Sequence, residues 1–366
     1  VPQARRLERK SRHLVFISVS AVALLCEVII WTFDIRAISG LTNWQFTIGL
    51  AALPGYALVA LMAGQFRARG WVRAGQWPDS ILFPVVAICV IQIAQFTEHT
   101  SLLWLLTAHT LAIWCAVAIY WLMSRSHLSG PQERMSNSEV TDIRTASMTI
   151  ALAGAVNVLS NRLPLITVSI LLGTPAAALY EAAQRIATLG TLGTWAAGVA
   201  VSPMMSDAHA RKQKNRMQDL LIASSWTAFL PSLLMLVILI PGAEFVLSLF
   251  GPEYAASQWA LVVLTGFAVI NASAGLTSNT FNMTGNEGIV LRCNCAQLLT
   301  ILILAPVLTN LTGIAGAALA VLVATMIRDL GMGFLLPGKL GLMPGVWSRL
   351  GTGRALEFAL TKAGMR

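Results

Sequence analysis

Three polar side chains interrupt a long apolar stretch near the middle of the chain: Asn157, Asn161 and Arg162. Residues four apart share one face of a helix, so the two asparagines and the neighbouring arginine are expected to form a polar stripe. A planar guanidinium binds phosphate through two hydrogen bonds, and amide groups suit sugar hydroxyls. The stripe could therefore bind a polar ligand. A simpler alternative is that Arg162 satisfies a helix–helix contact or extends to a membrane surface.

Charged residues also lie in two other apolar segments. Glu181 and Arg185 are four apart, a spacing that predicts an ion pair across one helical turn. Alternatively, Arg185 lines the same cavity as Arg162, and Glu181 tunes that cavity or carries a coupling proton. Glu27 lies deep in the first apolar segment, where a carboxyl group is either a buried hydrogen-bonded acid or part of a proton relay. Glu27 is thus a candidate for ion coupling.

Other polar and small residues suggest helix packing rather than chemistry. Asn271, Asn279 and Asn282 are expected to form interhelical hydrogen bonds. Close backbone packing is expected at the small residues Gly190, Thr194 and Gly198.

The sequence contains no pattern that predicts an enzyme, a metal site or a cofactor. The pair Cys293 and Cys295 has no second pair or nearby His to complete a zinc site, and the five histidines are scattered. No glycine-rich loop followed by Lys and Ser or Thr is present, so the chain itself is not expected to use ATP. The energy for any transport would come from an ion gradient, the membrane potential or removal of the product.

Composition identifies the chain as a polytopic, all-α membrane protein. Hydrophobic residues make up 56% and charged residues only 11% of the 366 residues, against about 25% charged in a typical soluble domain. Ten apolar segments approach the length that crosses a bilayer. With a cytoplasmic N-terminus, 22 of the 25 Lys and Arg residues fall on the cytoplasmic side, Arg36 falls outside, and Arg162 and Arg185 lie in helices. This bias follows the positive-inside rule, so the net charge of +9 reflects membrane topology and does not indicate a nucleic-acid partner.

The expected helices fall into two lobes. The first lobe, 1–124, holds four helices, and a cytoplasmic linker, 125–146, follows it. The second lobe, 147–337, holds six helices, and 338–366 forms a cytoplasmic tail. The ten expected helices are 14–33, 45–64, 80–97, 102–123, 147–172, 177–203, 220–241, 255–281, 294–310 and 313–336.

An internal repeat relates the two lobes. At an offset of 215 residues, Trp44 matches Trp259, Phe66 matches Phe281 and Gly70 matches Gly285. Repeats that run in the same direction indicate a pseudo-two-fold axis along the membrane normal, as in some transporters. A six-helix repeat unit would leave the first lobe two helices short, which suggests an incomplete N-terminus or a gene start placed at an internal codon.

Most of the chain resembles the polysaccharide and lipid-linked oligosaccharide flippases of the MOP exporter superfamily. The resemblance rests on short segments in the expected order: Phe66-Arg67-Ala68-Arg69-Gly70, Asn161-Arg162-Leu163, Leu171-Leu172-Gly173, Ala178-Leu179-Tyr180-Glu181-Ala182-Ala183-Gln184-Arg185-Ile186, Val201-Ser202-Pro203, Leu249-Phe250-Gly251-Pro252-Glu253-Tyr254, Gly285 and Gly313-Ile314-Ala315-Gly316-Ala317-Ala318. The chain has Pro164 where the family often has an acidic residue.

The resemblance implies a flippase for undecaprenyl-pyrophosphate-linked oligosaccharide, which moves the lipid to the outer leaflet for surface polysaccharide biosynthesis. Asn157, Asn161, Arg162, Glu181 and Arg185 would then bind the substrate. The family also implies a bacterial inner membrane, with both termini cytoplasmic. Its implied partners are the lipid-linked substrate, membrane lipids and other polysaccharide-assembly membrane proteins.

Three alternatives remain. An ion-coupled drug or small-molecule antiporter of the same superfamily predicts acidic residues in a central cavity, for which the chain offers Glu27 and Glu181. A sugar polymerase or ligase would need a sizeable external loop bearing catalytic Arg or His, and the external connections here are short. A chain that lacks two helices could also be an inactive remnant.

Overall fold

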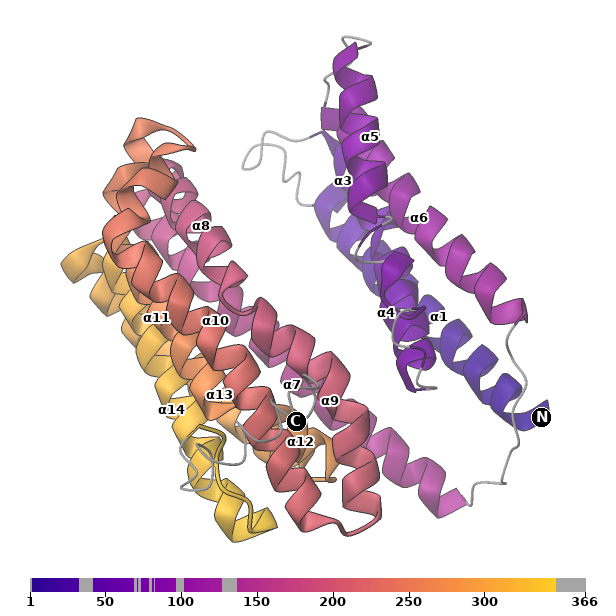
Figure 1. Ribbon diagram of the computed structural model, residues 1–366. Coiled ribbons are helices and arrows are strands. Elements are labelled where there is room, and N and C mark those ends of the chain that lie inside the picture. The colour runs from indigo at the N-terminus through magenta and orange to yellow at the C-terminus, as the bar shows by residue number, and fades with distance from the viewer. Residues whose placement is uncertain are drawn as a thin grey trace. The chain divides into compact units, whose positions relative to one another are not determined.

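The computed structural model describes residues 2–32, 42–68, 71, 74–78, 81, 83–96, 102–126 and 137–346. The chain divides into two compact units, unit 1 (Val1–Ser136) and unit 2 (Asn137–Arg366). Within the described ranges the regular structure is entirely helical (Figure 1). Arg36, residues 127–136 of the expected linker and the tail beyond residue 346 lie outside the described part of the chain.

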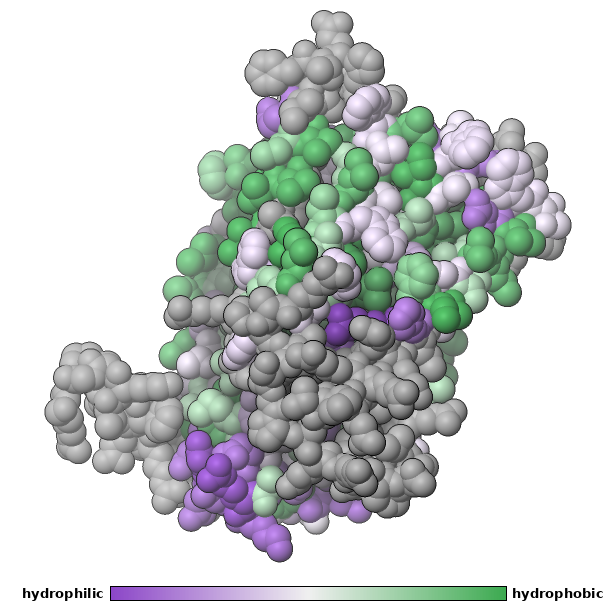
Figure 2. Space-filling view, turned by 90° about the vertical axis from the view of Figure 1, so that its right-hand side faces the viewer, coloured by the Kyte–Doolittle hydropathy of each residue, from purple (hydrophilic) through white to green (hydrophobic). Residues whose placement is uncertain are grey.

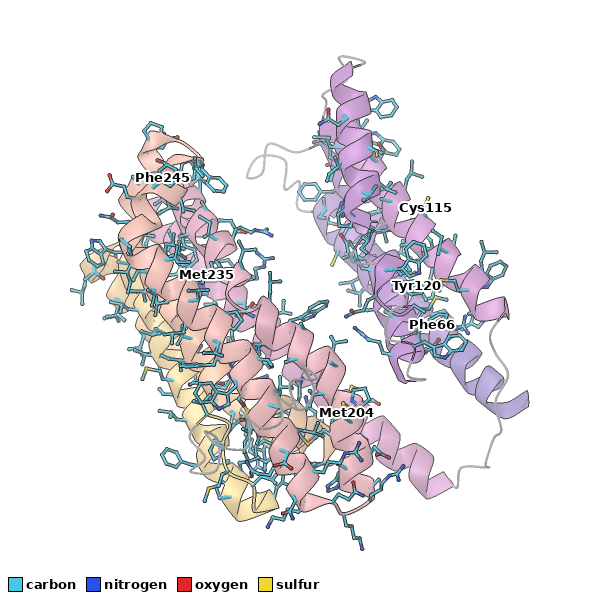
Figure 3. The ribbon with its side chains drawn as sticks, in the orientation of Figure 1. Phe66, Cys115, Tyr120, Met204, Met235 and Phe245 are labelled. Carbon is cyan, nitrogen blue, oxygen red and sulfur yellow. The ribbon has the colours of Figure 1, made fainter. Side chains whose placement is uncertain are left out.

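Five helices form the described part of unit 1. They are α1 (Pro2–Thr32), α3 (Asn43–Ala51), α4 (Leu53–Ala68), α5 (Phe83–Phe96) and α6 (Leu102–Ser126). Helix α6 packs against α3, α4 and α5, and α1 packs against α3 and α4. Phe66 of α4 and Tyr120 of α6 lie side by side in the core, with ring centroids 5.8 Å apart (Figure 3). The buried Tyr120 hydroxyl donates to the carbonyl oxygen of Gly75 at 2.9 Å, which satisfies its polar end.

Unit 2 is a larger helical bundle. It contains α7 (Asn137–Leu172), α8 (Thr174–Leu189), α9 (Leu192–Ala210), α10 (Lys214–Ser248), the short 3-10 helix η2 (Pro252–Ser257), α11 (Gln258–Ala274), α12 (Thr277–Met283), α13 (Glu287–Thr312) and α14 (Ile314–Leu340). Helix α13 packs against α7 and α14, and α11 packs against α8, α10 and α14.

Two large apolar clusters, together with a smaller one that includes Ile301 and Ala320, hold the described part of unit 2 together. One cluster includes Tyr180, Leu247 and Leu261, and it lies toward the η2 end of the bundle. The other includes Met205 and Phe281, and it lies toward the other end. Along α14, Ala317, Ala318 and Val321 belong to the first cluster, and Met332 and Leu336 to the second. Between these two sets α14 buries the polar residues Thr325, Arg328 and Asp329.

Among the residues that the structure describes, eight segments are long and apolar enough to cross a membrane. Large hydrophobic side chains cover much of their outer faces, for example Leu234, Val237 and Phe245 of α10, each more than half exposed. Figure 2 shows that hydrophobic groups cover much of the face it presents. Soluble proteins rarely expose apolar surface on this scale. The chain is a multi-pass membrane protein.

Several expected helices differ from the structure in their bounds, and segment 45–64 is divided at Ala52 into α3 and α4. Segment 177–203 is broken at Gly190 and Thr191, and segment 255–281 is broken at Gly275, whose φ of +72° lies in the left-handed region. Within segment 80–97 the structure describes α5, which has 14 residues. Helix α7 begins at Asn137, so residues 137–146 of the expected linker are helical. That stretch contains neither Pro nor Gly, so nothing in it breaks the helix.

The 215-residue repeat coincides with the helix boundaries. Helix α3 begins at Asn43 and α11 at Gln258, while α4 ends at Ala68 and α12 at Met283, each pair 215 positions apart. Trp44 and Trp259 are 68% and 67% exposed, and Phe66 and Phe281 are both buried. The matched residues thus occupy similar environments in the two units.

Candidate functional site

A cavity of about 450 Å³ lies within unit 2, at the level between its two large apolar clusters. Helices α7, α11, α12, α13 and α14 supply most of its lining. The lining is rich in amides and includes one ion pair: Asn157, Asn161, Asn271, Asn282, Asn294, Arg328 and Asp329. Phe267 and Met332 add apolar surface.

The ion pair joins two consecutive residues in the middle of α14. Arg328 donates from Nε to Asp329 Oδ1 at 2.7 Å and from Nη2 to Asp329 Oδ2 at 3.1 Å. The two side chains are only 10% and 4% exposed. Buried charges are tolerated when they are paired and hydrogen-bonded, and this two-point contact supplies both conditions.

Amides on two other helices complete the network. Asn271 of α11 donates from Nδ2 to Asp329 Oδ2 at 3.2 Å. Arg328 donates from Nη1 to Gln297 Oε1 of α13 at 3.2 Å, and Gln297 in turn donates to the Thr325 hydroxyl at 3.1 Å. The network therefore fixes the ion pair with respect to α11 and α13 as well as α14.

Several amides at the cavity keep unused hydrogen-bonding capacity. The Oδ1 atom of Asn282 is buried and has no partner among the described residues. Asn294 donates from Nδ2 to the carbonyl oxygen of Ala153 at 2.9 Å, and Asn161 donates to Asn157 Oδ1 at 3.1 Å. Leaving a buried polar atom unpaired costs about 1–3 kcal/mol, so a ligand that satisfied it would gain binding energy.

The structure brings only two of the five predicted substrate-binding residues to this cavity. Asn157 and Asn161 line it, as their shared helical face predicts. Arg162 is not part of the cavity lining, because the next residue along a helix points about 100° away. Arg162, Glu181 and Arg185 form a separate cluster instead.

In that cluster the carboxylate of Glu181 forms ion pairs with the guanidinium groups of both Arg162 and Arg185. Arg185 donates from Nε to Glu181 Oε1 at 2.7 Å, so the predicted ion pair across one turn is present. Arg162 Nη1 lies 3.9 Å from the same oxygen, and the Arg162 and Arg185 side chains are 55% and 72% exposed. Arg162 is ten residues before the end of α7, or about 15 Å along the helix axis. Exposed cations at that depth need contact with water or an anion rather than lipid.

Glu27 belongs to unit 1 and not to either of these groups. Its Oε1 atom accepts a hydrogen bond from the Thr47 hydroxyl of α3 at 2.8 Å. The carboxyl group is half-buried. This arrangement matches the hydrogen-bonded acid considered from the sequence, and it keeps Glu27 a candidate for coupling within unit 1.

The Arg328–Asp329 pair is the part of the site that sequence reasoning missed. The sequence count placed Arg328 with the cytoplasmic basic residues, whereas the structure places it inside α14, twelve residues before Leu340. That count is therefore wrong at Arg328. The physical reason is that an arginine bonded to the adjacent carboxylate does not need to leave the membrane core. An Arg-Asp dipeptide within an apolar run was the signal that could have identified it.

Comparisons with known proteins agree with this architecture. Residues 150–307 match the MatE family model. A MOP superfamily transporter from Pyrococcus furiosus, described as having a binding pocket of reverse polarity, shares 16% identity over 91% of this chain and 78% of its own, with a TM-score of 0.76. A multidrug resistance MATE family transporter solved in an outward-facing conformation shares 17% identity over 92% and 81%, with a TM-score of 0.70.

A mutant of a Vibrio cholerae MATE transporter shares 17% identity over 90% of this chain and 78% of its own, with a TM-score of 0.72. No curated protein matches the sequence. At such identities structural likeness establishes the fold. The chain therefore has the fold of the MATE transporters of the MOP superfamily, and residues 150–307 match the MatE family model.

Proposed function

We propose that this protein is a transporter of the MATE type that exports a small polar molecule. The observation that carries the proposal is the cavity of about 450 Å³ in the middle of unit 2. Small-molecule sites range over about 300–1,000 Å³ and combine apolar walls with a few placed polar groups. The cavity has that size and that composition.

The depth of the cavity supports a transport role. Arg328 lies fourteen residues after the start of α14, or about 21 Å into a helix about 40 Å long. Ionisable residues at the middle of a membrane-spanning helix commonly mark a substrate or ion pathway. The structures similar to this chain include MATE transporters, which supports the ion-coupled antiporter considered from the sequence. Asp329 and Glu27 are the carboxylates that would couple export to an ion gradient.

Blocking the cavity tests the proposal directly. Gly154 lines the cavity, and a Cβ at that position meets no atom within 4 Å. Gly154→Leu should place a bulky side chain in the cavity without removing a hydrogen bond. The matched control is Gly266→Leu, because Gly266 also has open space at its Cβ position but does not line the cavity.

The measurement is the cellular accumulation of a panel of small polar compounds in a deletion strain. Wild type and Gly266→Leu should restore low accumulation of the substrate, and Gly154→Leu should not, at equal levels of protein in the membrane. Full export by Gly154→Leu would exclude this cavity from the pathway.

The lipid-linked oligosaccharide flippase remains a second candidate, favoured by the cluster of Arg162, Glu181 and Arg185. Its net formal charge is +1, and its two guanidinium groups are exposed at membrane depth, a setting suited to a diphosphate. In a deletion strain, labelled lipid-linked oligosaccharide should then accumulate on the cytoplasmic leaflet. Arg162→Ala should fail to reverse that accumulation, whereas the wild-type gene should reverse it. Normal surface polysaccharide without accumulation would exclude this candidate.

As the resemblance to the flippases implies, we also propose that the chain lies in the inner membrane of a bacterium with both termini in the cytoplasm. The flippase adds the partners named from the sequence: the lipid-linked substrate and other membrane proteins of polysaccharide assembly.

A further inference from the structure

Building on the proposed transport function, we propose that the unit 2 cavity binds an uncharged, polyhydroxylated ligand the size of one sugar unit. The charge balance of the lining, the unused amide groups and the cavity volume each point to this class of ligand. None of these observations depends on the Arg162 cluster.

Charge argues against an ionic ligand. Among the described residues, Arg328 and Asp329 are the only ionisable side chains that line the cavity, and they are joined by two hydrogen bonds. An organic cation would have to displace Arg328 from Asp329, and an anion would have to displace Asp329 from Arg328. Asn271 and Gln297 hold the two charged groups in place from neighbouring helices. An uncharged ligand can enter without breaking this network.

The unused amide groups favour hydroxyls. Asn282 presents the buried, unpartnered Oδ1, and the described residues provide no donor to the carbonyl oxygens of Asn271 and Asn294. A hydroxyl both donates and accepts hydrogen bonds, so neighbouring sugar hydroxyls can pair with an amide carbonyl and with an amide NH₂ group together. Phe267 and Met332 supply apolar surface for the C–H face of a sugar ring.

The volume of the cavity limits the part of the ligand that it encloses to a single sugar unit. A volume of about 450 Å³ corresponds to roughly fifteen water molecules at liquid density. That space admits a single sugar unit and excludes a long glycan. The sugar could be a free molecule or one unit of a lipid-linked oligosaccharide, because both present the same hydroxyls.

The test is equilibrium binding to the purified full chain in nanodiscs. The probes are radiolabelled N-acetylglucosamine, galactose and glucose. The competitors are tetraphenylphosphonium as the cation and inorganic phosphate as the anion. We expect wild type to bind at least one sugar, and neither competitor to displace it. Displacement by tetraphenylphosphonium or phosphate, or failure to bind any sugar either free or carried on a diphosphate lipid, would overturn the proposal.

Two variants locate the bound sugar. Asn282→Leu removes the unpartnered carbonyl and should weaken binding at least tenfold, with Asn282→Ala as a smaller replacement should the leucine disturb folding. Asn310→Leu is the control, because Asn310 lies on an exposed part of α13 away from the cavity. Thermal unfolding of all variants should match wild type, because the Asn282 carbonyl has no partner to lose. Unchanged binding by both Asn282 variants would place the sugar elsewhere and refute the proposal.

Counterflow in proteoliposomes separates this proposal from the proposed function. Sugar binding without counterflow of any labelled compound would support the sugar site and contradict export. Counterflow of an organic cation with no sugar binding would support export and contradict the sugar site. Binding of free sugar points to a soluble substrate, whereas binding only of the diphosphate lipid form points to a lipid-linked one.

Discussion

The carboxylate of Asp329 accepts two hydrogen bonds from Arg328, the residue directly before it in α14, at 2.7 Å and 3.1 Å. Both side chains are almost fully buried, and Asn271 of α11 donates to the same carboxylate. A charged pair of this kind usually adds little stability over a well-packed apolar pair, but breaking it leaves one charge uncompensated. The pair therefore matters most when one member is lost.

Asp329→Leu should destabilise the protein by about 3–5 kcal/mol, because Arg328 would keep its charge without a carboxylate. Arg328→Met combined with Asp329→Leu should recover most of that loss. Thermal unfolding of the purified full chain measures both effects. Asp207→Leu is the control, since Asp207 forms a largely exposed pair with Arg211 and should change stability by less than about 1 kcal/mol. Equal unfolding temperatures for Asp329→Leu and the control would contradict this account.

Glu181→Gln should leave the stability of unit 2 nearly unchanged and alter anion binding. The two arginines that share Glu181 are more than half exposed, so their ion pairs contribute little to folding. Removing the carboxylate leaves two uncompensated guanidinium groups, and the apparent affinity for inorganic pyrophosphate should rise several-fold and fall with added salt. Competition binding at two ionic strengths measures this effect. Glu253→Gln, in η2, is the matched control. No pyrophosphate binding by any variant would count against the flippase candidate.

The sequence is sufficient to predict the helical architecture but not the helix breaks. Hydropathy is averaged over many residues, so a single glycine such as Gly190 or Gly275 is not detected within an apolar segment. Each of these two glycines nevertheless ends a helix. Glycine suits position 190 because a Cβ there would lie in tight contact, 3.1 Å, with the Cβ atom of Ala268 of α11. That neighbour is known only once the bundle has formed. The 215-residue repeat was detectable because it is a property of the sequence itself.

The candidate site was predictable only in part for the same reason. Asn157 and Asn161 are conspicuous because amides are rare in apolar runs, and both line the cavity. Asn271 was expected to bond between helices, and it does so with Asp329, 58 residues away. No local pattern specifies that partner. Arg328 was counted with the cytoplasmic basic residues because charge near the end of a helix usually marks its cytoplasmic limit.

Gly275→Ala should destabilise unit 2 and disturb the cavity. Gly275 has φ +72°, and a Cβ there would collide with the Ser225 hydroxyl. Strain of this kind costs of order 1–3 kcal/mol. Asn271 lies just before this break and Asn282 beyond it, so sugar binding should also weaken. Gly266→Ala, in the open part of α11, should be neutral or slightly stabilising. Thermal unfolding and sugar binding, measured on the same samples, distinguish Gly275→Ala from Gly266→Ala. Wild-type stability in Gly275→Ala would refute the role of this break.

Glu27→Gln tests where export is coupled to an ion gradient. Glu27 accepts a hydrogen bond from Thr47 at 2.8 Å, and glutamine keeps a carbonyl oxygen for that bond while removing the proton-binding group. If Glu27 carries the coupling proton, Glu27→Gln should abolish export driven by a proton gradient and retain counterflow, which needs no gradient. Glu287→Gln, at the start of α13, is the control and should retain both activities. Retention of gradient-driven export by Glu27→Gln, together with its loss in Asp329→Asn, would assign coupling to the α14 ion pair in unit 2 instead. Because each acid hydrogen-bonds within its own unit, the two variants separate the contributions of unit 1 and unit 2.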